Sequence, residues 1–141
     1  MKQALIFITL LTLPAIGGAS ASAGQRSAEG RQELIGRWRG SMADERQPTM
    51  ELVITAAKIS GKDLRTGDSL GEGRYSLDPA KKILDAQGAA NPVRGQNYLG
   101  IYSLQGDTLK WCSNNGSDKR PATLVHNPGQ GQFLMILKRQ K

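Results

Sequence analysis

Short stretches of alternating apolar and polar residues fill the chain from residue 34 to its C-terminus. The clearest are residues 97–104 and 107–113, which are separated only by Gln105 and Gly106. A two-residue connection that contains Gly, between two alternating stretches, is a strong signal of a β-hairpin. Residues 49–56 show the same period of two, and almost nothing in the chain has the period of a helix. The pattern therefore predicts a small antiparallel β protein.

Eight stretches are expected to be strands, at residues 37–42, 49–56, 58–64, 70–77, 81–86, 97–104, 107–113 and 132–139. Eight strands form a barrel whose interior is just wide enough to be filled by side chains or to hold one small ligand. Closure also leaves no exposed edge beside a long apolar strand such as 132–139. We therefore expect an all-β fold, an eight-stranded antiparallel up-and-down barrel over residues 34–141 with a short helical turn at 29–35. A two-sheet sandwich is the alternative architecture.

The N-terminal residues predict export. The positive charge of Lys2 precedes an apolar run over residues 4–16, and small residues follow up to Ala23. These are the three regions of a secretory signal peptide, and the run is shorter than the roughly 20 residues that span a bilayer. We expect cleavage after Ala23, with Ala19 and Ala21 as competing sites, so that residues 1–23 are removed. The product is expected to be a periplasmic or extracellular monomer without a membrane span, in which residues 24–33 are flexible.

Charge and cysteine content narrow the classes of function. The chain has 19 Lys and Arg against 12 Asp and Glu, a formal net charge of +7. The cations are spread along the chain and few aromatic residues lie between them, which argues against nucleic acid as a partner. Cys112 is the only cysteine, so no internal disulfide can form. Its expected role is that of a small buried or half-buried hydrophobe. The alternative is a reactive or dimer-forming thiol, for which no acidic or basic activating partner is adjacent in sequence.

Several short motifs occur in an order that resembles a known family. They are Leu34-Ile-Gly-Arg-Trp38, Gly73-Arg-Tyr-Ser-Leu-Asp-Pro79, Lys82-Ile-Leu-Asp85, Gly100-Ile-Tyr102, Gly106-Asp-Thr-Leu-Lys-Trp-Cys112, Arg120-Pro121 and Leu137-Lys-Arg139. The series resembles the planctomycetal lipocalin-like domain family of unknown function, which occurs in exported bacterial proteins. The resemblance implies an eight-stranded lipocalin-like barrel with no established activity.

Gly36-Arg37-Trp38 also resembles the Gly-x-Trp signature on the first strand of the wider lipocalin group. In that group a basic residue on the last strand packs over the Trp ring at the closed end of the barrel. The resemblance implies that Arg139 packs over Trp38 in this chain. The alternative is that Arg139 is a solvated charge and that Lys138 is the neighbour that matters. In both cases Gly36, Trp38 and Arg139 have a structural role in closing the barrel.

No arrangement of residues predicts catalysis. His126 is the only histidine, and it lies in a turn-like loop where a lone His is usually solvated or capping. A metal site needs several ligands, and the sequence holds no cluster of His or Cys. The serines lack a nucleophile elbow, and the Asp residues lie in or beside turns, where they favour local hydrogen bonds. We therefore expect a protein that is not an enzyme and that carries no cofactor and no metal.

Two functions remain for a non-catalytic barrel. One is to bind a small hydrophobic ligand in the interior, for which the candidate residues are Met50, Leu52, Ile54, Tyr75, Tyr98, Tyr102, Trp111, Phe133 and Met135. The other is to interact with proteins or envelope polymers through the outer face of a filled barrel. Close packing is the default in protein cores and favours a filled interior. A continuous apolar cavity of roughly a few hundred Å³ would instead support ligand binding.

Overall fold

The computed structural model of the chain describes residues 22–87, 97–114 and 119–141. The expected signal peptide up to Ala21 and most of the loop expected over 87–96 lie outside this part of the chain. Within it, the elements are α1 (Ala23–Leu34), β1 (Gly36–Met42), β2 (Met50–Ile54), β3 (Lys58–Asp63), β4 (Ser69–Asp78), β5 (Ile83–Gln87), β6 (Asn97–Tyr98), β7 (Gly100–Gln105), β8 (Thr108–Asn114), the 3-10 helix η1 (Pro128–Gln130) and β9 (Gln132–Gln140).

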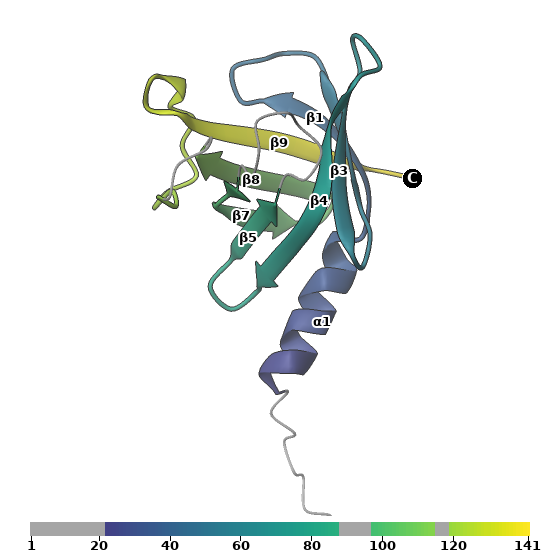
Figure 1. Cartoon of the computed structure of the whole chain (residues 1–141), viewed down its shortest axis with the longest axis vertical. Coiled ribbons are helices and arrows are strands. Elements are labelled where there is room, and N and C mark those ends of the chain that lie inside the picture. Colours follow the sequence, from purple (N-terminus) through teal and green to yellow (C-terminus); the bar gives the residue numbers. More distant parts are fainter. Residues whose placement is uncertain (1–21, 88–96, 115–118) are drawn as a thin grey trace, which may run out of the picture.

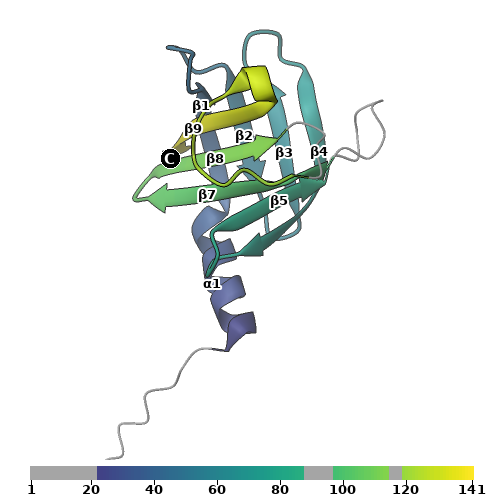
Figure 2. The ribbon, with the colours of Figure 1, turned by 90° about the vertical axis from the view of Figure 1, so that its left-hand side faces the viewer.

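The strands form one closed antiparallel barrel. Each strand from β1 to β5 pairs with the next, β5 pairs with β7, and β7, β8 and β9 follow until β9 pairs with β1. Strands β6 and β7 face β5 in the same register, so they count as one interrupted strand and the barrel has eight positions. Figures 1 and 2 show the strands wrapping around a common interior, with α1 beyond one end. The prediction of an eight-stranded barrel is confirmed, and the sandwich is excluded.

The hairpin between β7 and β8 has its loop one residue later than expected. Gln105 pairs with Thr108, so Gly106 and Asp107 form the two-residue connection. Gly106 has a φ of +57°, a conformation that favours glycine. The alternation alone placed the strands correctly, but the residue with positive φ determines where the chain turns.

The β5–β7 pairing is interrupted by a tryptophan side chain. The Trp111 Nε1–H donates to the Leu84 carbonyl at 3.0 Å, and the Gly100 N–H donates to Asp85 Oδ1 at 3.0 Å. These two bonds replace backbone bonds that the sheet lacks at this point. A Cβ at Gly100 would overlap Trp111 Nε1. Glycine is therefore required here so that the indole of β8 can reach across β7 to β5.

The helix expected near the N-terminus is present, but it is longer than the turn expected at 29–35 and includes residues 24–33, which were expected to be flexible. These residues form α1, a helix of 12 residues with a capping box between Ser22 and Gln25. Gly30 is buried against Pro79, where a Cβ would overlap the proline ring. The described side chains of the first two turns are exposed and form no apolar stripe, so the sequence pattern did not reveal the helix. Contact with the end of β4 holds its later turns.

Trp38 and Arg139 close the end of the barrel next to α1. They are opposite each other on β1 and β9, and the Arg139 guanidinium carbon lies 4.3 Å from the centre of the Trp38 ring. Arg139 also donates to the carbonyls of Glu33 at 2.6 Å and Ile35 at 3.1 Å, and Trp38 Nε1–H donates to the Leu34 carbonyl at 2.9 Å. Carbonyls at the end of a helix lack partners within the helix, and a cation there is favourable. The contact implied by the lipocalin resemblance is therefore present, and Arg139 is not a solvated charge.

We expect Arg139→Ala to lower the free energy of unfolding by about 3 kcal/mol, because it removes a cation–π contact and charge-assisted hydrogen bonds to helix carbonyls. Arg37→Ala is the matched control, since Arg37 lies on the adjacent strand with its side chain 62% exposed. Its effect should stay within about 0.5 kcal/mol. Urea unfolding at unchanged m-value measures both. Equal effects of the two substitutions would show that Arg139 does not hold the barrel closed.

Candidate functional site

The half of the barrel next to α1 is filled with side chains. Its core includes Leu34, Trp38 and Leu137 at 0% exposure and Ile54 at 1%. Tyr75 and Tyr102 are also buried in the core, and α1 closes the end beneath them. Three of the residues predicted to contact a ligand, Ile54, Tyr75 and Tyr102, belong to this packed core and are not among the residues that line the cavity in the other half.

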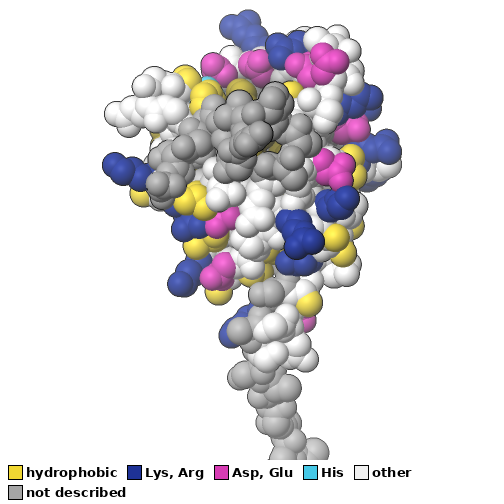
Figure 3. All heavy atoms as spheres, in the orientation of Figure 1, with side chains coloured by type: hydrophobic (Ala, Val, Ile, Leu, Met, Phe, Trp, Pro, Cys, Tyr) yellow, Lys and Arg dark blue, Asp and Glu magenta, His cyan; other side chains and the backbone are white. Residues whose placement is uncertain are grey.

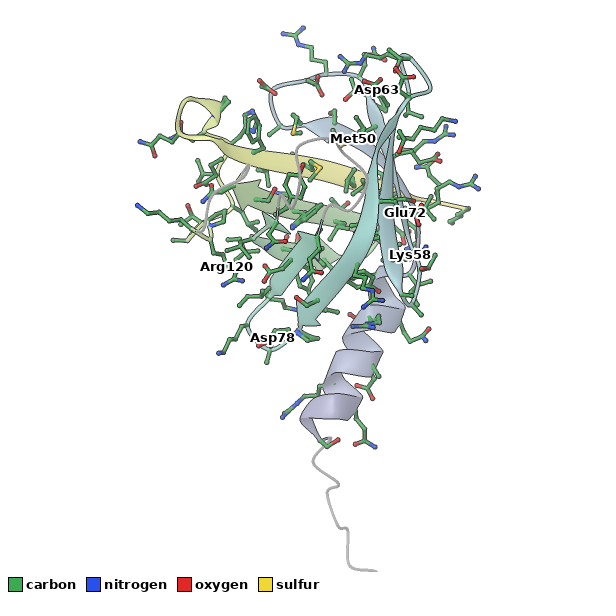
Figure 4. The ribbon with its side chains drawn as sticks, viewed as in Figure 1. Met50, Lys58, Asp63, Glu72, Asp78 and Arg120 are labelled. Atoms are coloured by element: carbon green, nitrogen blue, oxygen red, sulfur yellow. The ribbon has the colours of Figure 1, made fainter. Side chains whose placement is uncertain are left out.

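The other half of the barrel contains a cavity of about 320 Å³ that is partly open to solvent. It lies between the ends of the strands that are remote from α1, where Figure 4 labels Met50. Six of the predicted residues line it: Met50, Leu52, Tyr98, Trp111, Phe133 and Met135. The interior is therefore filled at one end only, in contrast to the expectation from close packing.

Glycines on β3 and β4 make room for the cavity. Gly61 and Gly71 are paired across these strands, and Gly73 is paired with Ile59 on the row beside them. All four residues line the cavity, so much of this wall is bare backbone. Gly71 and Gly73 are two residues apart on β4, so they occupy the same face of the sheet. Glycine at alternate positions of a predicted strand is the signal that could have revealed a hollow interior.

Several residues of the wall are not among those predicted from the sequence, namely Met42, Ile59, Ser60, Gly61, Leu70, Gly71, Glu72, Gly73, Ala86, Gln87 and Ser113. Leu70 reaches the cavity because of a β-bulge. Gly61 pairs with Gly71 but Lys62 pairs with Ser69, so Leu70 is an extra residue on β4. A bulge of this kind redirects a side chain. Leu70 is 47% exposed and forms part of the rim.

The cavity wall carries almost no charge. Glu72 is the only acidic or basic residue among the described residues of the wall, and its carboxylate pairs with Lys58 Nζ at 2.8 Å. The buried Ser113, together with Ser60 and Gln87, supplies polar groups. An apolar wall with a few polar groups is the usual composition of a site for a small molecule.

His126 and Cys112 lie outside the cavity wall. Cys112 is fully buried on the outer side of β8, as predicted, and burial raises the pKa of its thiol. The His126 side chain is 12% exposed, so it is not solvated. Its Nδ1 accepts from the Leu134 N–H at 3.0 Å, and its Nε2 lies 3.2 Å from Asp44 Oδ1 without hydrogen-bond geometry. His126 therefore has a capping role that connects the loop before β9 to that strand.

Charges of both signs mix on the outer surface. In Figure 3 the dark blue and magenta side chains lie close together on the described part of the visible face. Arg39 Nε donates to Glu51 at 2.7 Å, and this hydrogen bond lowers the pKa of the Glu51 carboxyl. Arg65 and Asp63 form a similar pair at 3.0 Å. The paired carboxylates neutralise part of the positive charge, so the excess cations are separated into small areas of the surface.

No protein-family model, curated protein or solved structure matches the chain. The resemblance to the planctomycetal lipocalin-like family therefore stays a prediction. In the part of the chain that the structure describes, no helix combines the length and apolar character needed to cross a bilayer. The same residues contain no group of three or more His, Cys, Asp or Glu side chains that could hold a metal ion.

The two core tyrosines should resist ionisation. Burial raises the pKa of Tyr75, although the positive charge of Arg31 acts in the opposite direction. Burial also raises the pKa of Tyr102, and the negative charges of Glu33 and Asp78 raise it further. Because the pKa is raised in the folded state, each buried tyrosine contributes its full stabilisation below about pH 10. That contribution is lost as the pH rises through the folded-state pKa. Tyrosinate absorbance should therefore develop at higher pH in the native protein than in urea.

The control for this titration is Tyr102→Phe, which should remove part of the delayed absorbance and leave the rest. The native protein should also unfold at lower urea concentration once the pH exceeds about 11, above the ordinary tyrosine pKa. Identical titration curves in the native and unfolded states would contradict the burial of both phenols.

Proposed function

We propose that this protein is an exported, non-catalytic binding protein that takes a small uncharged hydrophobic molecule into the half of the barrel remote from α1. The cavity of about 320 Å³ carries this proposal. Sites for small molecules usually have volumes of roughly 300 to 1,000 Å³, so this one suits a ligand at the small end of that range. A barrel that served only to present its outer face would gain stability from a filled interior.

The preference for an uncharged ligand follows from the side chains that line the cavity wall. A buried charge needs an opposite charge or several hydrogen bonds, and without them its burial costs several kcal/mol or more. Glu72 is already paired with Lys58, and no basic side chain is among the described lining residues. Trp111 Nε1–H is also occupied, by the Leu84 carbonyl. Ser113 and Gln87 can hydrogen-bond a hydroxyl or carbonyl group of a ligand but cannot neutralise a carboxylate.

Export supports the same function, because a small binding protein outside the cytoplasm would meet apolar molecules from the envelope or the medium. The N-terminal signal pattern supports this part of the proposal. The rival function is an interaction domain that uses the outer surface. The paired charges described above offer less support for it than the cavity offers for ligand binding.

Binding can be measured with N-phenyl-1-naphthylamine, an uncharged apolar dye whose fluorescence rises in apolar surroundings. We expect the protein to bind the dye, and dodecanol to displace it at lower concentration than dodecanoate does. Ala86→Leu adds three carbons to the cavity wall. These carbons take the place of three buried carbons of the ligand, which costs roughly 2 kcal/mol of binding free energy, so affinity should fall about thirtyfold.

Ser76→Leu is the matched control, because Ser76 is exposed on β4 and its neighbour Tyr75 is paired with Ala86. This variant should bind the dye like the unmodified protein. The proposal is wrong if neither dye nor alcohol binds, or if both leucine variants bind equally well. Stronger displacement by dodecanoate would refute the preference for an uncharged ligand.

A further inference from the structure

All methionines of the chain other than Met1 line the same cavity. They are Met42, Met50 and Met135, which come from β1, β2 and β9. These strands are neighbours in the barrel, with β1 between β2 and β9. Met50 is 7% exposed and Met135 is 8% exposed, while Met42 is half-buried. The sequence separates these residues widely, and only closure of the barrel brings them together.

The register allows the three side chains to converge. Met42 is directly opposite Met135 on β9, and Met50 is opposite Gly40, two residues before Met42. Directly opposed residues have Cα atoms about 4.5 to 5.5 Å apart, and diagonal neighbours at about 7 to 8 Å are within reach of long side chains. Met42 lies on the strand between the other two methionines and is therefore within reach of both. Three flexible thioethers can therefore approach a common point.

Packing alone does not explain this cluster. Methionine commonly fills irregular gaps in a core, because its side chain is long and flexible. Here a cavity of about 320 Å³ remains beside three such side chains. Leucine or isoleucine would provide a similar apolar surface with fewer rotatable bonds. What methionine adds to the wall is a polarizable sulfur atom.

Thioether sulfur is a soft ligand that selects copper(I), whereas carboxylate and carbonyl oxygens suit magnesium, calcium and manganese. The described cavity wall contains no His or Cys, and its one carboxylate, Glu72, is engaged by Lys58. The formal charge of +7 opposes weak electrostatic binding of cations. Among the described side chains of the wall, the three thioethers are therefore the donors that suit a soft cation.

We propose that Met42, Met50 and Met135 form a binding site for a soft monovalent metal ion of the copper(I) and silver(I) class. This proposal does not rest on the proposed apolar ligand, although both use the same cavity. Trp111 is directly opposite Met135 on β8 and lines the cavity, so its fluorescence reports on the site. Trp38 is fully buried at the other end and supplies an internal reference.

The test is a titration of the purified chain with silver nitrate in chloride-free buffer, and with acetonitrile-stabilised copper(I) under argon. We expect one equivalent of either metal to quench part of the tryptophan fluorescence, and zinc and magnesium salts to have no effect. A triple variant with Met42→Leu, Met50→Leu and Met135→Leu should bind at least about a hundredfold more weakly, a loss of about 2.7 kcal/mol. Leucine nearly conserves volume and polarity, so the fold should persist.

Cys112→Ser is the essential control, because a thiol also binds both metals. Its side chain lies on the outer side of β8 and contacts the Val125 carbonyl, so this variant should bind like the unmodified protein. Equal binding by the triple variant, loss of binding in Cys112→Ser, or no binding of either metal would each overturn the proposal. Dye binding by the unmodified protein, measured without metal, tests the proposed ligand site alone, so its failure is distinguishable from a failure of the metal site.

Discussion

The stacking of Arg139 on Trp38 is the contact on which the rest of the structure depends. It joins the last strand, the first strand and the C-terminal end of α1 at one place. A guanidinium can do this because it is planar and has five N–H donors, so it covers the indole and still bonds the carbonyls of Glu33 and Ile35. Lysine has neither a planar cationic group nor a forked set of N–H donors. With this end closed, the sheet has no free edge between β1 and β9.

The two halves of the interior have different roles. Leu34, Trp38 and Leu137 are fully buried in one half and supply the close packing that a small domain needs for stability. The other half leaves about 320 Å³ unfilled beside Gly61 and Gly71. An unfilled apolar cavity costs stability. Departures from good packing in natural proteins tend to mark functional sites, and this one coincides with the thioethers and the aromatic wall.

Much of the barrel could be predicted because alternation is a local property of the sequence. It located all eight strand positions and placed Met50, Trp111 and Phe133 on the inner face. Other features could not be predicted in this way. Helix α1 lacks an apolar stripe and depends on Gly30 meeting Pro79 at the end of β4. The inward turn of Leu70 depends on a bulge, which shifts the register by one residue and so escapes a simple period of two.

By itself, the sequence determined where the strands lie and which side chains point inward, since both follow from neighbouring residues on the same strand. It also indicated, through the Gly-x-Trp motif and Arg139, how the barrel closes. Only the tertiary structure decided that Ile54, Tyr75 and Tyr102 pack into a solid core while Met42, Met50 and Met135 border a cavity. The reason is that an interior volume is enclosed by side chains from strands far apart in the chain, and no local pattern records the space left between them.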